Sequence, residues 1–169
     1  MTRSCVTAAA VLAVLSIAPT SEAQELILGA NIGAGSGVEG GDPGGGHVRF
    51  RRARSRIVGQ LEMRVDEDRK NGLGIVVFAE IEPSAAVGGS LRYLRWLSPN
   101  VYGFAGLTGA GAPHTLFGGE LGAQFQIPLG KMLSVFVEPS FAALPLGTDL
   151  PQDHVLLWGL LSAGIHANL

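Results

Sequence analysis

The sequence predicts an all-β protein, an eight-stranded antiparallel up-and-down transmembrane β-barrel. Three observations support this prediction. After residue 24 the chain alternates between apolar and polar residues with a period of two and shows no helical period. Turn-forming residues divide this alternation into eight segments. The final segment, 153–169, is far longer than the usual ~5–6 residues of a soluble strand, and a tilted strand crosses a bilayer with about 9–11.

The final segment reads DHVLLWGLLSAGIHANL. Every second residue, counted back from Leu169, is apolar or small, whereas the residues between them include Trp158, Ser162 and His166. This pattern predicts a strand with one apolar and one mixed face. It resembles the closing strand of bacterial outer-membrane β-barrels, although Phe is commoner than Leu at their last position. The resemblance implies recognition by the barrel assembly machinery during biogenesis, through Leu161, Ala163, Ile165, Ala167 and Leu169.

Residues 1–23 are expected to be a cleaved signal peptide. Arg3 gives a positive start, residues 6–18 form a short apolar run, and small residues precede Gln24. Cys5, the sole cysteine, lies in this segment, so the mature chain is expected to lack disulfides and thiol chemistry. Residues 24–169 then form one barrel domain. Its net charge stays at −2 because the segment removes one basic and one acidic residue, so charge predicts no nucleic-acid partner.

The strands are expected at 25–37, 47–66, 73–82, 85–97, 101–112, 115–127, 132–143 and 153–169. Asn71-Gly72 is the strongest local turn signal. The glycine-rich segment 38–46 and segment 144–152 are expected to be longer loops. Short turns on one side and longer loops on the other are typical of outer-membrane barrels. Both faces of segment 101–112 are apolar or glycine, so its inward face is left unassigned.

Over its mature length the chain resembles the small eight-stranded outer-membrane barrels of the OmpA-transmembrane and OmpX type. The resemblance implies an integral protein of the bacterial outer membrane with a structural or surface-interaction role, without a cofactor and monomeric. Outer-membrane lipid and lipopolysaccharide are the expected partners. Aromatic residues with a polar group, which would form an interfacial girdle in such a barrel, are few: Tyr93, Trp96, Tyr102 and Trp158.

Charged residues on the polar faces of these strands are expected to point into the barrel. An eight-stranded barrel is just wide enough to be filled by its own side chains, and a buried charge needs a partner. A packed, salt-bridged interior is therefore the main interpretation, and a proton or ion path is the alternative. The expected interior residues are Glu62, Arg64, Glu80, Arg92, Glu120 and Glu138.

A basic run, HVRFRRARSR, opens the second expected strand at its outer end. Arginine binds phosphate groups through two parallel hydrogen bonds, and lipopolysaccharide is rich in phosphate. Contact with lipopolysaccharide is one interpretation of this run, and a solvated rim with arginines paired to Glu80, Glu82 or Asp42 is the other. The expected contact residues are Arg49, Arg51, Arg52, Arg54 and Arg56.

Two other classes of protein remain as alternatives. A lipid A-modifying outer-membrane enzyme would need a serine, a histidine and an acid close together, and Ser140, Ser162, His154, His166, Glu138 and Asp153 are available. No motif joins them, so we expect no catalytic residues, and the histidine spacing predicts no metal site. A secreted soluble barrel with a ligand pocket would turn its apolar faces inward instead of outward.

Overall fold

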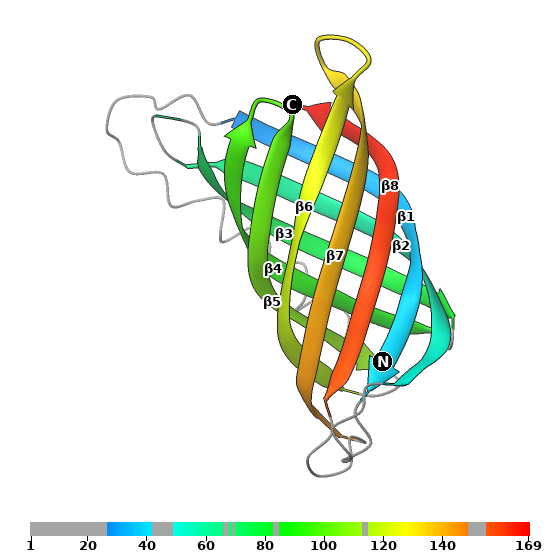
Figure 1. Ribbon diagram of the computed structural model, residues 1–169. Helices are drawn as coiled ribbons and strands as arrows, with labels where there is room; N and C mark the ends of the chain where they lie inside the picture. The colour runs from blue at the N-terminus through cyan, green and yellow to red at the C-terminus, as the bar shows by residue number, and fades with distance from the viewer. Residues whose placement is uncertain are drawn as a thin grey trace, which may run out of the picture.

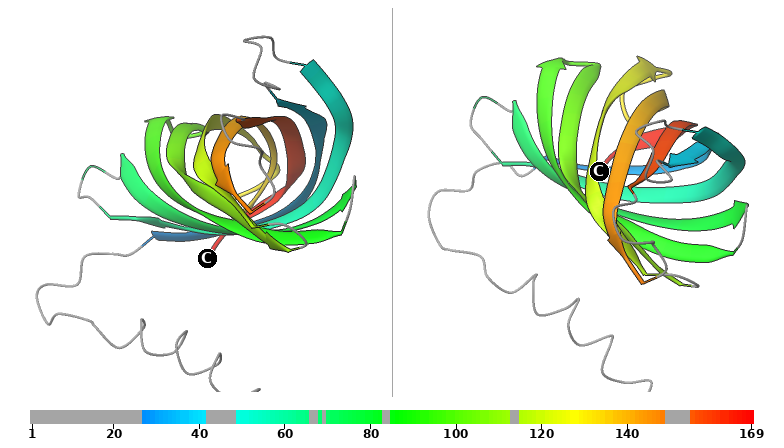
Figure 2. Two further views of the ribbon diagram at one scale, coloured as in Figure 1. Left: turned by 90° about the horizontal axis from the view of Figure 1, so that it is seen from below. Right: turned by 60° about the horizontal axis from the view of Figure 1, so that its bottom comes forward.

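The computed structural model describes residues 27–41, 49–65, 68, 70–82, 85–112, 115–148 and 155–169. These residues form one sheet of eight antiparallel strands that closes on itself through pairing of β1 with β8. The barrel is shown from the side in Figure 1, and from below and obliquely in the two views of Figure 2. The predicted all-β, up-and-down, eight-stranded barrel is therefore confirmed. The expected signal peptide, residues 1–23, lies outside the described residues.

The strands follow one another around the barrel in sequence order. Their bounds are β1 Ile27–Gly41, β2 Arg49–Arg64, β3 Asn71–Glu82, β4 Ala86–Ser98, β5 Val101–Ala112, β6 Leu116–Pro128, β7 Leu133–Gly147 and β8 Leu156–Asn168. The start of β1, the end of β8 and the β6–β7 turn share one end of the barrel, the upper end in Figure 1. We call this the terminal end, and the opposite end the loop end. No helix in the described part of the chain is both long and apolar enough to cross a membrane.

Three expected turn or loop segments are partly strand. Val38 pairs with both Ala53 and Gly159, so β1 continues into the glycine-rich segment. Leu144 is fully buried and pairs with Leu156, so β7 continues into the expected loop. Asn71-Gly72 does not form the turn but begins β3. In a closed barrel every strand has hydrogen-bonding partners on both sides, and this tertiary pairing overrides the weak strand preference of glycine and asparagine.

Side chains alternate between the two faces of the wall, as the period of two predicts. The large apolar side chains on one face are exposed to the outside, including Ile32, Leu61, Val77, Leu121 and Leu161. The other face fills the interior with both polar and apolar groups. In β5, whose faces the sequence left unassigned, Tyr102, Phe104 and Thr108 point inward.

Inward-facing glycines leave room for aromatic rings from neighbouring strands. Phe78 lies across from Gly88 in the register of β3 and β4, and Phe104 lies across from Gly122 in β5 and β6. A methyl group added at Gly122 would lie 2.5 Å from Cζ of Phe104. Each ring therefore occupies the volume that a larger residue on the next strand would need.

Two apolar clusters fill the barrel on either side of a polar middle. The cluster nearer the loop end contains Val58, Val76, Phe78, Ala110, Ala142, Leu144, Trp158 and Leu160. The cluster nearer the terminal end contains Leu94, Trp96, Tyr102 and Phe104. Phe78 and Trp158 meet edge to face with ring centroids 6.3 Å apart. Charged and amide side chains lie between the clusters, and they form the candidate site.

Candidate functional site: the charged interior and the apolar wall

Arg92, from the middle of β4, is the centre of the buried polar network. Its Nε donates to Oε1 of Glu120 over 2.6 Å, and its Nη1 donates to Glu138 over 3.1 Å. Nη1 also donates to Oε1 of Gln60 over 2.8 Å, and the guanidinium stacks on Phe104 at 4.0 Å. Only 1% of Arg92 is exposed. Two carboxylates and an amide thus compensate a charge that would otherwise be very costly to bury.

Arg54 forms a second buried cluster nearer the loop end. Its guanidinium donates hydrogen bonds to the carboxylates of Glu39 and Glu80 and lies over the Trp158 ring at 4.0 Å. Arg56 lies between the two clusters with its guanidinium 5.2 Å from the Phe78 ring centroid. Each of the three buried arginines, Arg54, Arg56 and Arg92, thus places its guanidinium over an aromatic ring of an apolar cluster.

Glu62 anchors a third group towards the terminal end. The Tyr102 hydroxyl donates to Glu62 over 3.0 Å, and Nε2 of Gln60 donates to both residues. His166 places Nδ1 3.7 Å from Glu62 and 2.6 Å from Oδ1 of Asn31. This group touches the Arg92 cluster through Gln60, so the interior forms one continuous polar layer.

Five of the six expected interior charges are buried, namely Glu62, Glu80, Arg92, Glu120 and Glu138. Arg64, the sixth, is half-buried at the terminal end, where it stacks on Trp96 at 4.4 Å. The structure brings Arg92, Glu120 and Glu138 into direct contact but joins Glu80 to Arg54. The sequence prediction did not include Gln60, Tyr102 or His166 in this network, although each follows the inward period of its strand.

Arg54 and Arg56 do not belong to the expected lipopolysaccharide contact. Both side chains are buried and point into the barrel, so neither can contact lipopolysaccharide on the outside. The reason is the alternation itself: both residues share the inward face of β2 with Val58 and Gln60. The structure describes the strand positions of Arg49, Arg51 and Arg52 but not their side chains, so lipopolysaccharide contact by these three stays a prediction.

Three of the four aromatic residues that could have formed a girdle lie inside the barrel. Trp96, Tyr102 and Trp158 are buried inside the barrel, and only Tyr93 is exposed on the outer wall. Tyr93 and Arg95 both donate to Oδ1 of Asn71 near the terminal end. Inside the barrel, Trp96 and Tyr102 belong to the apolar cluster nearer the terminal end, and Trp158 belongs to the cluster nearer the loop end.

The outer wall carries a broad apolar belt. Among the strand residues whose side chains are described, two charged ones are exposed: Glu82 at the loop end of β3 and Arg95 near the terminal end of β4. Between these levels the outward residues of β3 are all apolar: Leu73, Ile75, Val77, Ala79 and Ile81. The span from Leu73 to Ile81 is comparable to the ~9–11 residues with which a tilted strand crosses a bilayer.

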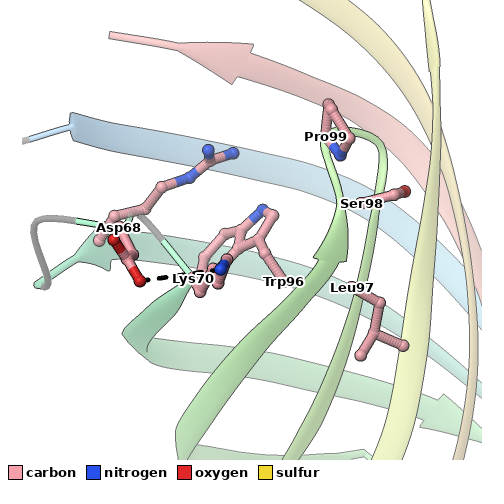
Figure 3. A pocket seen from close by; sticks show the side chains of 7 residues that line it. Asp68, Lys70, Trp96, Leu97, Ser98 and Pro99 are labelled. Carbon is pink, nitrogen blue, oxygen red and sulfur yellow. Dashed lines mark ion pairs between the residues drawn. The ribbon is translucent and has the colours of Figure 1, made fainter.

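An open pocket of about 360 Å³ lies at the terminal end, beside the turns (Figure 3). It is lined by Arg64, Asp68, Lys70, Trp96, Leu97, Ser98 and Pro99. Lys70 and Asp68 form an exposed ion pair with 3.7 Å between Nζ and Oδ2. Exposed pairs of this kind contribute little, about 0–1 kcal/mol, so the pocket is a solvated rim and not a built site.

Among the described residues, His166 is not brought next to either candidate serine, Ser140 or Ser162. His166 and Ser162 lie four residues apart on β8, which separates them by about 13 Å at the ~3.3 Å rise of a strand. The ring nitrogens of His166 contact the side chains of Asn31, Asn168 and Glu62. Within the described part of the chain no group of three or more histidine, cysteine or acidic side chains could hold a metal ion.

The packed interior predicts that the barrel does not conduct ions. Apolar side chains lie on both sides of the ion-paired Arg92, Glu120 and Glu138, and all three charged side chains are almost completely buried. In a planar lipid bilayer we expect the reconstituted chain to show no stepwise conductance. Regular single-channel steps from purified protein, absent from a protein-free control, would contradict a sealed interior.

Comparison with known proteins gives distant structural similarity and no match in sequence. No protein-family model and no curated protein matches the chain. A de novo designed transmembrane β-barrel superposes with a TM-score of 0.46 at 9% identity, covering 89% of this chain and 100% of the designed one. Ail, the attachment invasion locus protein of Yersinia pestis, superposes with a TM-score of 0.40 at 11% identity, covering 82% and 97% of the two chains. The fold assignment here rests on the strand pairing of the chain itself.

Proposed function

We propose that this chain is an integral protein of the bacterial outer membrane with a structural or surface-interaction role. The observation that carries the proposal is the inside-out arrangement of the wall: apolar side chains face outward, while charged side chains are buried inside, where Arg92 is ion-paired to Glu120 and Glu138. A soluble protein rarely exposes an apolar surface larger than a few hundred Å². A ring of exposed Leu, Ile, Val and Phe around the whole barrel is expected only where lipid replaces water.

A single charge at the middle of the belt tests this proposal. Val77 is 63% exposed in the middle of β3, so Val77→Arg would be nearly harmless if the wall faced water. In a bilayer the same substitution should cost about 2–4 kcal/mol, because an arginine at the midplane loses its hydration. The measurement is the free energy of unfolding by urea in lipid vesicles.

Leu97→Arg is the matched control for this measurement. Leu97 is also highly exposed but lies at the terminal end of β4, close to the expected headgroup level. There the cost should fall to about 0–1 kcal/mol. Equal and negligible costs at both positions would count against a lipid-facing wall and favour a soluble barrel.

A more specific form of this proposal is that Arg49, Arg51 and Arg52 bind lipopolysaccharide. These residues begin β2 at the loop end, the end expected to face outside the cell. Replacing all three by glutamine should reduce retention on immobilised lipopolysaccharide if their guanidinium groups bind its phosphates. The exposed Arg95, at the opposite end, supplies a control substitution by glutamine. Unchanged retention of the triple variant would show that these three arginines do not bind lipopolysaccharide.

A further inference from the structure

A groove lined by apolar residues crosses the outer wall over β5, β6 and β7. Its volume is about 410 Å³. Small outward residues form its floor, namely Ala105, Gly119 and Ala143. Larger apolar residues form its sides, namely Leu121, Phe141 and Pro145. The groove is therefore a depression in a belt whose surface is elsewhere built from branched and aromatic side chains.

The register of the three strands explains why the groove forms here. Gly119 lies across from Ala143 in β7, and the next outward residue, Leu121, lies across from Phe141. Across β6 and β7 a pair of small residues thus lies beside a pair of large ones. The small floor residue of β5, Ala105, lies across from Leu121, so the small residues follow an oblique line over the three strands. Glu120 also borders the groove, but its buried side chain is directed into the barrel, so it contributes backbone. The groove consequently presents no charged side chain to a ligand.

The direction of the groove indicates what kind of molecule would enter it. It begins near the loop end of the barrel, at Pro145 and Val155, and reaches the middle of the wall at Ala105 and Leu121. A lipid in the leaflet on the loop side would extend its hydrocarbon chain along the same path, from the headgroup level towards the middle of the bilayer.

We propose that this groove holds one acyl chain of a bilayer lipid from the leaflet on the loop side. The proposal rests on the membrane location proposed above. Lipid tails and apolar side chains are equally apolar, so preference for the groove comes from close van der Waals packing. An unfilled groove would forfeit these contacts along its whole lining. A flexible hydrocarbon chain can follow the oblique path across three strands.

Photolabelling from within the bilayer tests the proposal. The full chain is reconstituted into phosphatidylcholine vesicles that contain a small fraction of phosphatidylcholine with a diazirine on one acyl chain. After illumination, labelled residues are located by mass spectrometry. We expect labelling of Leu121 and Phe141 to exceed, several-fold, that of Leu61 and Ile75, which are similarly exposed parts of the belt outside the groove.

A pair of glycine variants separates the groove from the belt in general. Gly119→Leu fills the floor, and a Cβ there would meet nothing nearer than the Gly106 carbonyl oxygen at 3.7 Å. Gly59→Leu adds the same side chain to β2, where the nearest atom is Cγ2 of Val77, also at 3.7 Å. We expect Gly119→Leu to remove the excess labelling of Phe141 and Gly59→Leu to leave it unchanged.

The outcomes distinguish failure of this inference from failure of the proposed function. Even labelling around the belt of an inserted barrel would show that acyl chains do not prefer the groove. The proposed membrane location would then stand. Crosslinks between two copies of the chain through Phe141 would assign the groove to self-association and overturn the lipid assignment. A chain that stays in the aqueous phase and takes up no label would overturn both.

Discussion

Arg92→Met is expected to destabilise the barrel by about 3–5 kcal/mol, the usual cost of breaking a buried ion pair by removing one partner. Arg92 is the recorded partner of both Glu120 and Glu138, and all three side chains are almost completely buried. Removing the guanidinium leaves two neighbouring, buried carboxylates without their ion-pair partner. The measurement is the free energy of unfolding by urea in vesicles or detergent micelles.

Two further variants show whether the loss comes from the stranded carboxylates. Arg95→Met removes an exposed arginine from the same strand and should change stability by less than about 1 kcal/mol. Adding Glu120→Gln and Glu138→Gln to the Arg92→Met chain should recover much of the lost stability, because neutral amides need no counter-charge. An Arg92→Met chain as stable as the original would contradict the role of Arg92 as the centre of the network.

Gly122→Ala is expected to cost about 1–3 kcal/mol, the usual range for overpacking a filled interior. The added methyl group would lie 2.5 Å from Cζ of Phe104 and 2.5 Å from the carbonyl oxygen of Pro139. The ring could move only into an apolar cluster that is already packed, and the carbonyl belongs to the neighbouring strand. Urea unfolding and the yield of folded barrel measure the effect.

Gly103→Ala provides the matched control because Gly103 lies on the outer face of the adjacent strand. A methyl group there would meet nothing nearer than the Gly122 carbonyl oxygen at 3.8 Å. Its cost should be close to zero, and a small gain is expected because alanine restricts the unfolded chain. Equal effects of the two substitutions would show that the contact of Phe104 with Gly122 does not limit the packing of the interior.

Much of the fold could be predicted from the sequence because a membrane barrel repeats one local rule. Alternation with a period of two identified the outward faces of β3, β4 and β8 and placed Arg92, Glu120 and Glu138 on the opposite faces. Each assignment needed only the residues of one strand. For β5, where Gly, Ala and Leu occupy both faces, that local signal is absent, and the inward position of Tyr102 and Phe104 followed only from the structure.

Other features depended on neighbouring strands and could not be predicted strand by strand. Trp96 and Trp158 would be interfacial anchors in isolation, but Trp96 packs into the space left by Gly72 and Trp158 packs edge to face on Phe78 inside the barrel. Arg54 belongs to a basic run that suggests a surface, yet it pairs with Glu39 and Glu80 from the strands on either side. Which partner a buried charge finds depends on the register and tilt of the closed sheet, and these are long-range properties.

Fractionation of a Gram-negative host that expresses the chain tests the central claim most directly. The membrane fraction is run on a denaturing gel with and without boiling. A band in the outer-membrane fraction whose mobility changes on heating is the predicted result, because a closed eight-stranded sheet with a lipid-facing wall should resist detergent until heated. A soluble product whose mobility is the same before and after boiling would contradict it.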